Sequence, residues 1–451
     1  MDEVTRKLQD FTSSLTPFAL SQCRQHMHSS VLREHGAGVM IPTGAAATQL
    51  RDIYGHADVD AFFRPPENRE RLDSSLESFL CIQLSECVDG LDQLDPRLDQ
   101  AVLLARLQEF HRYIASGKMP FSLVFRIANI EITNPFQLSN NITIRELDDY
   151  ELKAFDIHID HWNLSPYLRS DWKRHRVVAE VGLVGTPAEY EAYGTVEKQG
   201  ELVNAITHPF YLQGIHWTVA PAVTNIAYRS MAHCWTHEKS MHNVSHRLYQ
   251  IDANDVSGIC RWHAFLKSLP EDSTLLASVD RALLGMKRSL QHPNRTNSPN
   301  WDKAVDYVIA MESLLTKTQG GSVSGETSYR FRLNGASLLF AARDDDREAT
   351  FNALKALYAL RSKVVHGDSA TMKEDRLFLK SLNADLSECS HDIHYLHLVC
   401  RYLETWLCDI FTFLDSMSVE NRPYKARMGW ERLLWNSSES LPGEELAAQP
   451  D

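Results

Sequence analysis

The sequence predicts an α+β protein in which a mixed α/β N-terminal region is followed by an all-α helical bundle. Two patterns lead to this expectation. From residue 120 to residue 190, β-branched and apolar residues alternate with polar ones, as they do in half-buried strands. After about residue 273, apolar residues recur at three-to-four spacing, as they do in helices that pack on one another. We therefore expect the two kinds of structure in separate regions.

The N-terminal region begins with segments of helical pattern, up to about residue 115. These are LDSSLESFLCIQLSECV (72–88) and LDQAVLLARLQEFHRYIAS (98–116), and IPTGAAATQL (41–50) is expected to be a simple turn. Strands are predicted in FSLVFRIANIEI (121–132), FQLSNNITIREL (136–147) and HRVVAEVGLVG (175–185), with a short helix at DDYELKAF (148–155). Residues 200–270 have a mixed α/β pattern.

The C-terminal region is predicted to contain helices at 274–290, 300–317, 326–342, 347–366 and 389–416. Ser298 and Pro299 are helix-start signals. The expected organisation is a regulatory region at 1–272, divisible into lobes at 1–115 and 116–272, a helical domain at 273–417, and a C-terminal segment at 418–451. That last segment should be disordered from about residue 436, where it is polar and acidic.

Composition favours a cytoplasmic globular protein without a membrane span. The 451 residues are 43% hydrophobic, and no run approaches the roughly 18 apolar residues of a spanning helix. Eight cysteines without CxxC pairs are typical of reduced thiols. The chain carries −13, but residues 274–372 contain thirteen Lys and Arg and ten Asp and Glu, a net +3 that leaves −16 elsewhere. A polyanion site is therefore expected in the C-terminal third.

The predicted helix REATFNALKALYALRSKVVH (347–366) carries a charge within an apolar stripe. One stripe contains Phe351, Leu354, Tyr358, Arg361 and Val365, and a second contains Leu357, Leu360 and Val364. Burying a guanidinium costs several kcal/mol unless an acid or a phosphate pairs with it. Glu312 falls in an apolar stripe of the 300–317 helix, so it is a candidate partner for Arg361, and Arg330 or Arg332 could equally pair with Glu312.

His366 ends the same helix but faces elsewhere. Five helical positions place it about 140° around the axis from Arg361. Gly367 follows as an expected helix C-cap, which leaves the imidazole in the last turn. This geometry suits a composite site formed by two copies of the motif across a two-fold axis.

Three segments of the C-terminal region resemble the HEPN superfamily, and more narrowly the Apea-like HEPN domains. They are VDYVIAMESLL (305–315), ETSYRFRLNGASLLF (326–340) and LKALYALRSKVVHGDS (354–369), and the last contains the Arg-x4-6-His signature. The resemblance covers about residues 274–417. It implies an all-α bundle, usually dimeric, and in active members a metal-independent ribonuclease that acts as an effector in toxin–antitoxin, abortive-infection or other antiviral defence systems.

The resemblance implies that Arg361 and His366 are the catalytic pair. RNA supplies the 2′-hydroxyl nucleophile, His366 would move protons, and Arg361 would hold the scissile phosphate. Lys363, Arg330 and Arg332 are candidates for further RNA contacts, and Ser362 lies where relatives often have another polar residue. We expect no cofactor and no metal. The expected partners are RNA, with tRNA among the candidates, a second copy of the chain, and a phage-derived trigger or an antitoxin.

The alternative is a non-catalytic HEPN module that dimerises or binds a nucleotide or RNA, with Arg361 in a structural ion pair. Two histidine-rich runs could instead indicate metal. AHCWTHEKSMHNVSH (232–246) matches no zinc-site spacing, and in CSHDIHYLHLVC (389–400) a packing face rich in histidine is the favoured reading.

Overall fold

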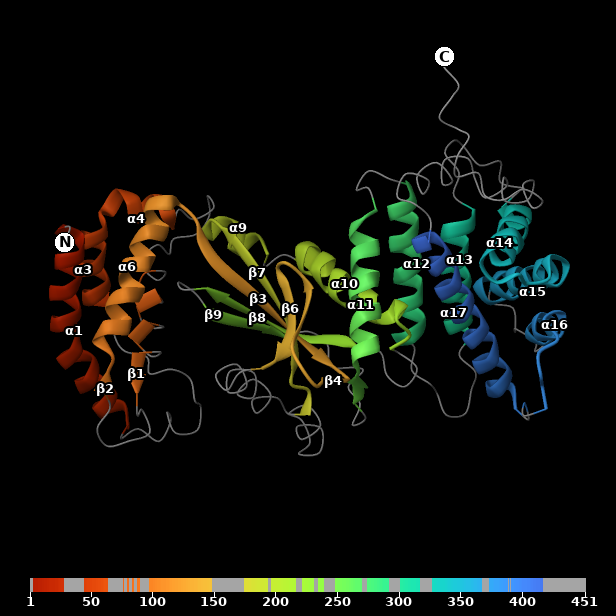
Figure 1. Cartoon of the computed structure of the whole chain (residues 1–451), viewed down its shortest axis with the longest axis horizontal. Helices are drawn as coiled ribbons and strands as arrows, with labels where there is room; N and C mark the ends of the chain where they lie inside the picture. The colour runs from red at the N-terminus through yellow and green to blue at the C-terminus, as the bar shows by residue number, and fades with distance from the viewer. Residues whose placement is uncertain are drawn as a thin grey trace, which may run out of the picture. The chain divides into compact units, whose positions relative to one another are not determined.

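The computed structural model describes residues 3–27, 44–63, 76, 79–80, 83–84, 87–89, 97–147, 174–193, 196–215, 221–230, 234–238, 248–269, 274–291, 301–316, 327–366, 373–387, 389 and 391–416. These residues form a mostly helical fold with a small antiparallel sheet, which confirms the α+β class (Figure 1). The chain divides into two compact units. The first comprises Met1–Thr207 and Pro221–Cys260, and the second comprises His208–Ala220 and Arg261–Asp451.

The first unit begins with helices and a short two-stranded ladder. They are α1 (Glu3–Met27), α3 (Gly44–Tyr54), α4 (His56–Phe62), β1 (Val88–Asp89), β2 (Arg97–Leu98) and α6 (Gln100–Ser116). The core of these helices is aromatic: Phe110 is fully buried and its ring stacks on that of Phe79 at 3.7 Å. The Tyr54 hydroxyl donates to the Leu107 carbonyl at 2.8 Å, which ties α3 to α6.

The expected turn at IPTGAAATQL is wrong over most of its length. Residues from Gly44 onward are helical in α3, where Ala47 and Leu50 are buried in the core of these helices. Alanine, glutamine and leucine are strong helix formers. The interpretation as a turn gave too much weight to the single glycine, which stands at the first position of the helix, where it interrupts nothing.

A six-stranded antiparallel sheet is the second part of this unit. Its strands are β3 (Met119–Ala128), β5 (Phe136–Ser139), β6 (Ile142–Glu146), β7 (Val177–Gly185), β8 (Ala222–Ser230) and β9 (Cys234–Glu238), in the order β5-β6-β7-β3-β8-β9. A separate parallel pair joins β4 (Ile130–Ile132) to β10 (Tyr249–Ile251). The three predicted strand segments are therefore strands, and residues 200–270 do mix helix and strand.

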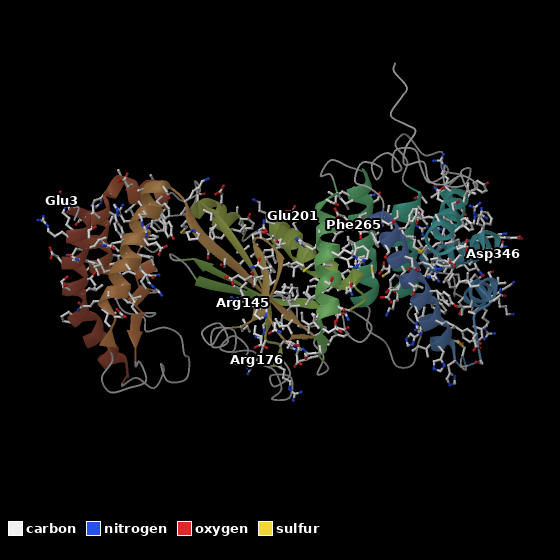
Figure 2. The ribbon with its side chains drawn as sticks, in the orientation of Figure 1. Glu3, Arg145, Arg176, Glu201, Phe265 and Asp346 are labelled. Carbon is white, nitrogen blue, oxygen red and sulfur yellow. The ribbon has the colours of Figure 1, made fainter. Side chains whose placement is uncertain are left out.

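Alternation along the strands places Phe121 on one face of the sheet and Glu180 on the other, and both faces contain buried residues. On the first face, Phe121 meets the ring of Tyr190 from α9 (Pro187–Ala192) edge-on at 5.2 Å. On the other face, Glu180 of β7 accepts from Ser122 of β3 at 2.8 Å and from Arg145 of β6 at 2.7 Å, and Figure 2 labels Arg145. These two bonds cross three neighbouring strands and so favour their pairing in this register.

Two helices contribute residues to both units, because each crosses a division between them. They are α10 (Val196–Leu212) and α11 (Ala253–Lys267). In the second unit, Tyr211, Trp262, Phe265 and Leu269 belong to the same hydrophobic core as the downstream helices. The second unit therefore includes residues that precede residue 273.

The rest of the second unit is helical in its described residues. Its helices are α12 (Thr274–Gln291), α13 (Asp302–Leu315), α14 (Thr327–Arg343), α15 (Arg347–Val365), α16 (Lys373–Ser381) and α17 (Asp392–Ser416). Five were predicted from apolar spacing, but α16 was not, because it is short and strongly charged. Its Phe378 and Leu379 are nevertheless fully buried. The predictions for DDYELKAF, Ser298, Pro299, Gly367 and residues 418–451 lie outside the described residues.

Helices α12 and α13 approach closely at Gly285, and we predict that a side chain there is costly. A Cβ at this position would lie 2.9 Å from the Asp306 carbonyl oxygen and 3.0 Å from the Ala310 Cβ. Gly285→Ala should therefore lower the free energy of unfolding by about 1–3 kcal/mol despite its better helix propensity.

Urea unfolding followed by circular dichroism tests this expectation, with Gly200→Ala in α10 as the matched control. A Cβ at Gly200 would meet nothing within 4 Å. The control should be neutral or stabilising by up to about 1 kcal/mol. Equal midpoints for the two variants would contradict the close approach of α12 and α13.

Candidate functional site

Helix α15 carries both residues of the predicted catalytic pair. The helix begins after Asp346, whose side chain accepts from the Ala349 amide at 3.0 Å as an N-cap. It ends at Val365, and His366 is the C-cap residue, with its amide donating to the Ser362 carbonyl at 3.1 Å. The buried face consists of Thr350, Ala353, Leu354, Ala356, Leu357 and Leu360.

The stripe that contains Arg361 is not fully buried, contrary to the sequence interpretation. Leu354 is inside, but Phe351, Tyr358 and Arg361 are partly exposed and Val365 is 54% exposed. The core face of α15 lies instead along Leu357 and Leu360. Arg361 therefore stands at the edge between core and surface, where a ligand can reach it.

Arg361 pairs with Glu312 of α13, the first of the partners considered for it. Its Nη2 lies 3.6 Å from Glu312 Oε2, with 28% of the arginine side chain and 18% of the glutamate side chain exposed. This distance exceeds a hydrogen bond, so the contact is an electrostatic pair only. Arg361 Nε is buried and has no hydrogen-bond partner among the described groups, and the guanidinium lies 5.8 Å from the centre of the Tyr358 ring. Because Nε is buried, only the exposed part of the guanidinium could meet a ligand.

His366 is exposed at the end of the helix, and within the described residues no hydrogen bond joins it to Arg361. Ser362 is partly buried and contributes its carbonyl to the His366 amide. Helical spacing predicts that the imidazole and the guanidinium lie on different sides of α15.

Lys363 has an acidic partner, which sequence reasoning did not foresee. Its Nζ lies 2.5 Å from Glu374 Oε1 on α16, and only 9% of the Glu374 side chain is exposed. The ammonium therefore neutralises an acid that is almost buried. An RNA phosphate would have to compete with Glu374 for this lysine.

The two arginines of α14 lie in different surroundings. Arg330 is partly exposed. Arg332 donates from Nε to the Ser328 carbonyl at 3.0 Å, and its Cζ lies 5.0 Å from the centre of the Phe351 ring. No Arg332–Glu312 ion pair occurs among the described residues. Glu312 pairs with Arg361 instead.

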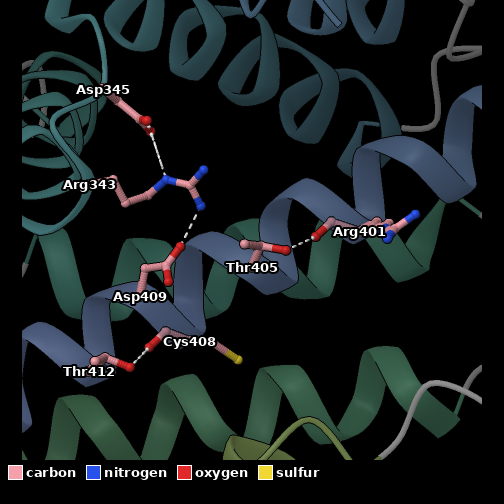
Figure 3. Close-up of polar contacts among 7 residues, drawn as sticks. All are labelled: Arg343, Asp345, Arg401, Thr405, Cys408, Asp409 and Thr412. Atoms are coloured by element: carbon pink, nitrogen blue, oxygen red, sulfur yellow. Dashed lines mark hydrogen bonds and ion pairs between the residues drawn. The ribbon is translucent and has the colours of Figure 1, made fainter. Parts of the chain in front are cut away.

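At the C-terminal end of α14, Arg343 differs from Arg332 because it forms ion pairs with two aspartates. Figure 3 shows Arg343 between Asp345 and Asp409, with its Nε 3.1 Å from Asp345 Oδ2 and its Nη1 2.5 Å from Asp409 Oδ2. These acids raise the pKa of Arg343, against the opposing effect of burial. Arg343 joins α14 to α17 and is unavailable to a phosphate.

The histidine run of α17 is not a packing face, which corrects that reading. His391, His394 and His397 are exposed, whereas Leu396 and Val399 are buried. The three-residue spacing keeps the histidines on one side of the helix, but the neighbouring side is the one that is buried. In the described part of the chain, no cluster of three metal-ligating side chains occurs. Of the run at 232–246, only the backbone of β9 is described.

Buried ionisable groups close to this region were missed by sequence reasoning. Glu404 of α17 is buried, and burial raises its pKa to about 7 although Lys303 and Tyr307 oppose the shift. Burial also raises the pKa of Cys400 and Cys408 to about 12, so both thiols stay protonated. The described cysteines form no disulfide with one another. Such residues give no signal in a sequence, because burial depends on which helices pack around them.

The buried carboxyl of Asp375 in α16 should make the stability of the protein depend on pH. It is fully buried and its Oδ2 has no hydrogen-bond partner among the described groups, and burial raises its pKa from 3.8 to about 6, with Asp392 adding to the shift. Because the folded state binds the proton more tightly than the unfolded chain, this residue favours folding most below about pH 4. Its contribution falls as pH rises to about 6, by up to about 3 kcal/mol.

Asp375→Asn should remove that dependence between pH 4 and pH 6. Urea midpoints of the wild type and the variant across this range provide the measurement, with Glu348→Gln, at an exposed acid of α15, as the control. Parallel pH profiles for wild type and Asp375→Asn would show that Asp375 is not the responsible group.

Comparison with known proteins adds no identification. No family model matches the chain, and no curated protein or solved structure matches it significantly. Among the described residues, the structure has no helix that is both long and apolar enough to cross a bilayer.

Proposed function

We propose that this protein is a metal-independent endoribonuclease of HEPN type, with Arg361 and His366 as its catalytic pair. The observation that carries the proposal is the position of Arg361 and its contact with Glu312. This arginine is at the edge of a helical core with 28% of its side chain exposed, and it lies next to an acid that it does not hydrogen-bond. A structural ion pair would be expected to hydrogen-bond its own acid.

The chemistry needs only groups that α15 carries and a nucleophile from the RNA. The 2′-hydroxyl attacks the adjacent phosphorus, and His366 accepts or donates the proton that moves. Arg361 holds the phosphate oxygens as charge builds on them. The bond to the 5′-oxygen of the next nucleotide breaks, which leaves a 2′,3′-cyclic phosphate and a 5′-hydroxyl.

The placement of the pair favours a homodimer. Helical spacing places Arg361 and His366 about 140° apart around the helix axis, so one phosphate would be reached more readily by Arg361 of one protomer and the imidazole of its partner. Glu312 would keep the guanidinium in position. In this proposal, the helical unit forms the dimer and the N-terminal sheet and helices sense a trigger or select RNA, as in an effector of antiviral defence or a toxin–antitoxin pair in the cytoplasm.

A second candidate is a non-enzymatic module, and the Glu312–Arg361 pair is the observation that favours it. An ion pair that links α13 to α15 stabilises the helical unit whether or not RNA is cleaved. In that case the unit would serve for dimerisation or for nucleotide or RNA binding.

Incubation of the purified full chain with total RNA and with tRNA in excess EDTA tests the proposal. The expected result is cleavage without added metal, with 2′,3′-cyclic phosphate ends that resist direct radiolabelling of the 3′ end. Light scattering of the same sample should give the mass of a dimer. Intact RNA, or cleavage that EDTA abolishes, would overturn the proposed activity.

A further inference from the structure

The packed helices α14 and α15 carry a row of aromatic and arginine side chains at their common surface. The aromatic–arginine strip consists of Tyr329 and Arg332 from α14 and of Phe351, Tyr358 and Arg361 from α15. Tyr329 is 52% exposed and the other four are partly exposed. Phe351, Tyr358 and Arg361 lie on one side of α15, so the row follows the helix axis.

Each arginine of the strip lies beside aromatic rings. Arg332 Cζ is 5.9 Å from the centre of the Tyr329 ring and 5.0 Å from that of Phe351, and these two rings are 6.3 Å apart at 74°. Arg361 Cζ is 5.8 Å from the Tyr358 ring. Tyr358 in turn lies 5.7 Å from buried Phe331, which supports it from the core. The rings are therefore held in place, and one of them is largely open to solvent.

The charge of the strip is opposite to that of the whole chain. Helix α14 contains three arginines and no acid, and α15 contains Arg347, Lys355, Arg361 and Lys363 against Glu348 alone, within a chain of net charge −13. Arg343, at the far end of α14, is neutralised by two aspartates (Figure 3). Arg332 forms no ion pair with a described acid, and Arg361 has only the 3.6 Å contact with Glu312. Positive charge is thus present at both ends of the strip, from Arg332 beside Phe351 and from Arg361 near His366.

We propose that the aromatic–arginine strip binds single-stranded RNA and leads it to Arg361. This inference rests on the proposed ribonuclease activity and assigns the substrate class of that site. Exposed rings stack on unpaired bases, which present their faces, whereas a duplex hides its bases within the stack. Arginines beside the rings contact the phosphates between those bases. The positive charge of the strip favours a polyanion as its occupant.

The dimensions of the strip suit a short stretch of single strand. From Phe351 to Arg361 the helix rises about 15 Å, at about 1.5 Å per residue. Bases stacked near Tyr329 and Phe351 would place a following phosphate near Arg361, at the end of α15 that also carries His366. The strip therefore acts by positioning RNA, while Arg361 and His366 act on the phosphate.

Binding of a labelled 2′-O-methyl oligouridine of twelve nucleotides to the full chain tests the inference, because this probe cannot be cleaved through its 2′ position. Fluorescence anisotropy would compare it with the same oligonucleotide annealed to its complement. Tyr329→Leu keeps apolar area but removes the ring, and Tyr329→Phe keeps the ring. Arg332→Gln removes one charge, and Lys380→Gln removes one exposed charge from α16 as its control. Thermal melts and light scattering check fold and oligomeric state.

The expected result is tighter binding of the single strand than of the duplex, with at least about fivefold weaker binding for Tyr329→Leu and little change for Tyr329→Phe. Arg332→Gln should lower the salt dependence of log K by about 0.7, which Lys380→Gln should not do. Unchanged affinity in Tyr329→Leu would overturn the inference. So would a variant that loses its dimer but binds RNA normally, because the strip would then be a protein interface.

Cleavage assays on natural RNA with the same preparations separate the two proposals. Binding that follows the predicted pattern without any cleavage would reject the nuclease and keep the strip. Cleavage with an unchanged affinity for the probe in Tyr329→Leu would keep the nuclease and reject the strip.

Discussion

Arg361→Ala and His366→Ala are each expected to reduce RNA cleavage by at least about a hundredfold. A positioned acid or base typically contributes about 10²–10⁴-fold, and a guanidinium on a phosphoryl transition state contributes at least as much. Arg361→Lys should recover only part of the rate, because lysine keeps the charge but cannot form the bidentate contact with the phosphate. Initial rates on one defined RNA at equal enzyme concentration provide the measurement.

Folding controls show whether a lost cleavage rate reflects lost chemistry or lost structure. His366 is exposed, so His366→Ala should leave the urea midpoint unchanged. Arg361→Ala leaves the mostly buried Glu312 without its cation and should lower stability by about 1 kcal/mol or more. In the non-enzymatic alternative, Glu312→Ala and Arg361→Ala destabilise non-additively, because they break one contact. The wild type then cleaves no better than either variant, and equal background cleavage in all samples would reject the nuclease.

Trp406→Ala is expected to produce the largest loss of stability, about 3–5 kcal/mol. Trp406 of α17 is 1% exposed and lies in the core of the second unit, where its ring meets that of Phe378 from α16 at 5.5 Å and 78°. Truncation removes this ring contact and leaves a cavity between α16 and α17. Urea unfolding followed by far-ultraviolet circular dichroism provides the measurement.

The matched control for Trp406→Ala is Leu377→Ala, at the exposed surface of α16. Leu377 precedes Phe378 in α16 but is 47% exposed. Its replacement should change stability by no more than about 0.5 kcal/mol. Similar losses for Trp406→Ala and Leu377→Ala would mean that α16 and α17 do not pack through the tryptophan.

Local periodicity predicted much of the secondary structure. The alternation in residues 121–132 and 175–185 became strands β3, β4 and β7, and the apolar spacing in residues 347–366 became α15. It failed where the local signal was short or mixed. Gly44 was interpreted as part of a turn although the alanines after it form α3, and charged α16 was missed although its Phe378 is buried.

The candidate site could be predicted in part. A charge in an apolar stripe required a partner, and Glu312 on another predicted helix was the first one considered, because opposite charges in two facing stripes neutralise each other. The Lys363–Glu374 pair could not be predicted, since α16 itself was not expected. The exposure of His391, His394 and His397 was also missed, because the step of three residues shows that they share a side and not which side is buried.

The sequence by itself determined which residues share a helix face, because the repeat of about 3.6 residues depends only on the chain. It thereby placed Arg361 with Phe351 and Tyr358, and His366 away from them. Only the tertiary structure decided that this face lies at the surface while Leu357 and Leu360 form the core. The reason is that a helix with two apolar stripes buries the one that its neighbours cover, and α13, α14 and α16 determine that from distant parts of the chain.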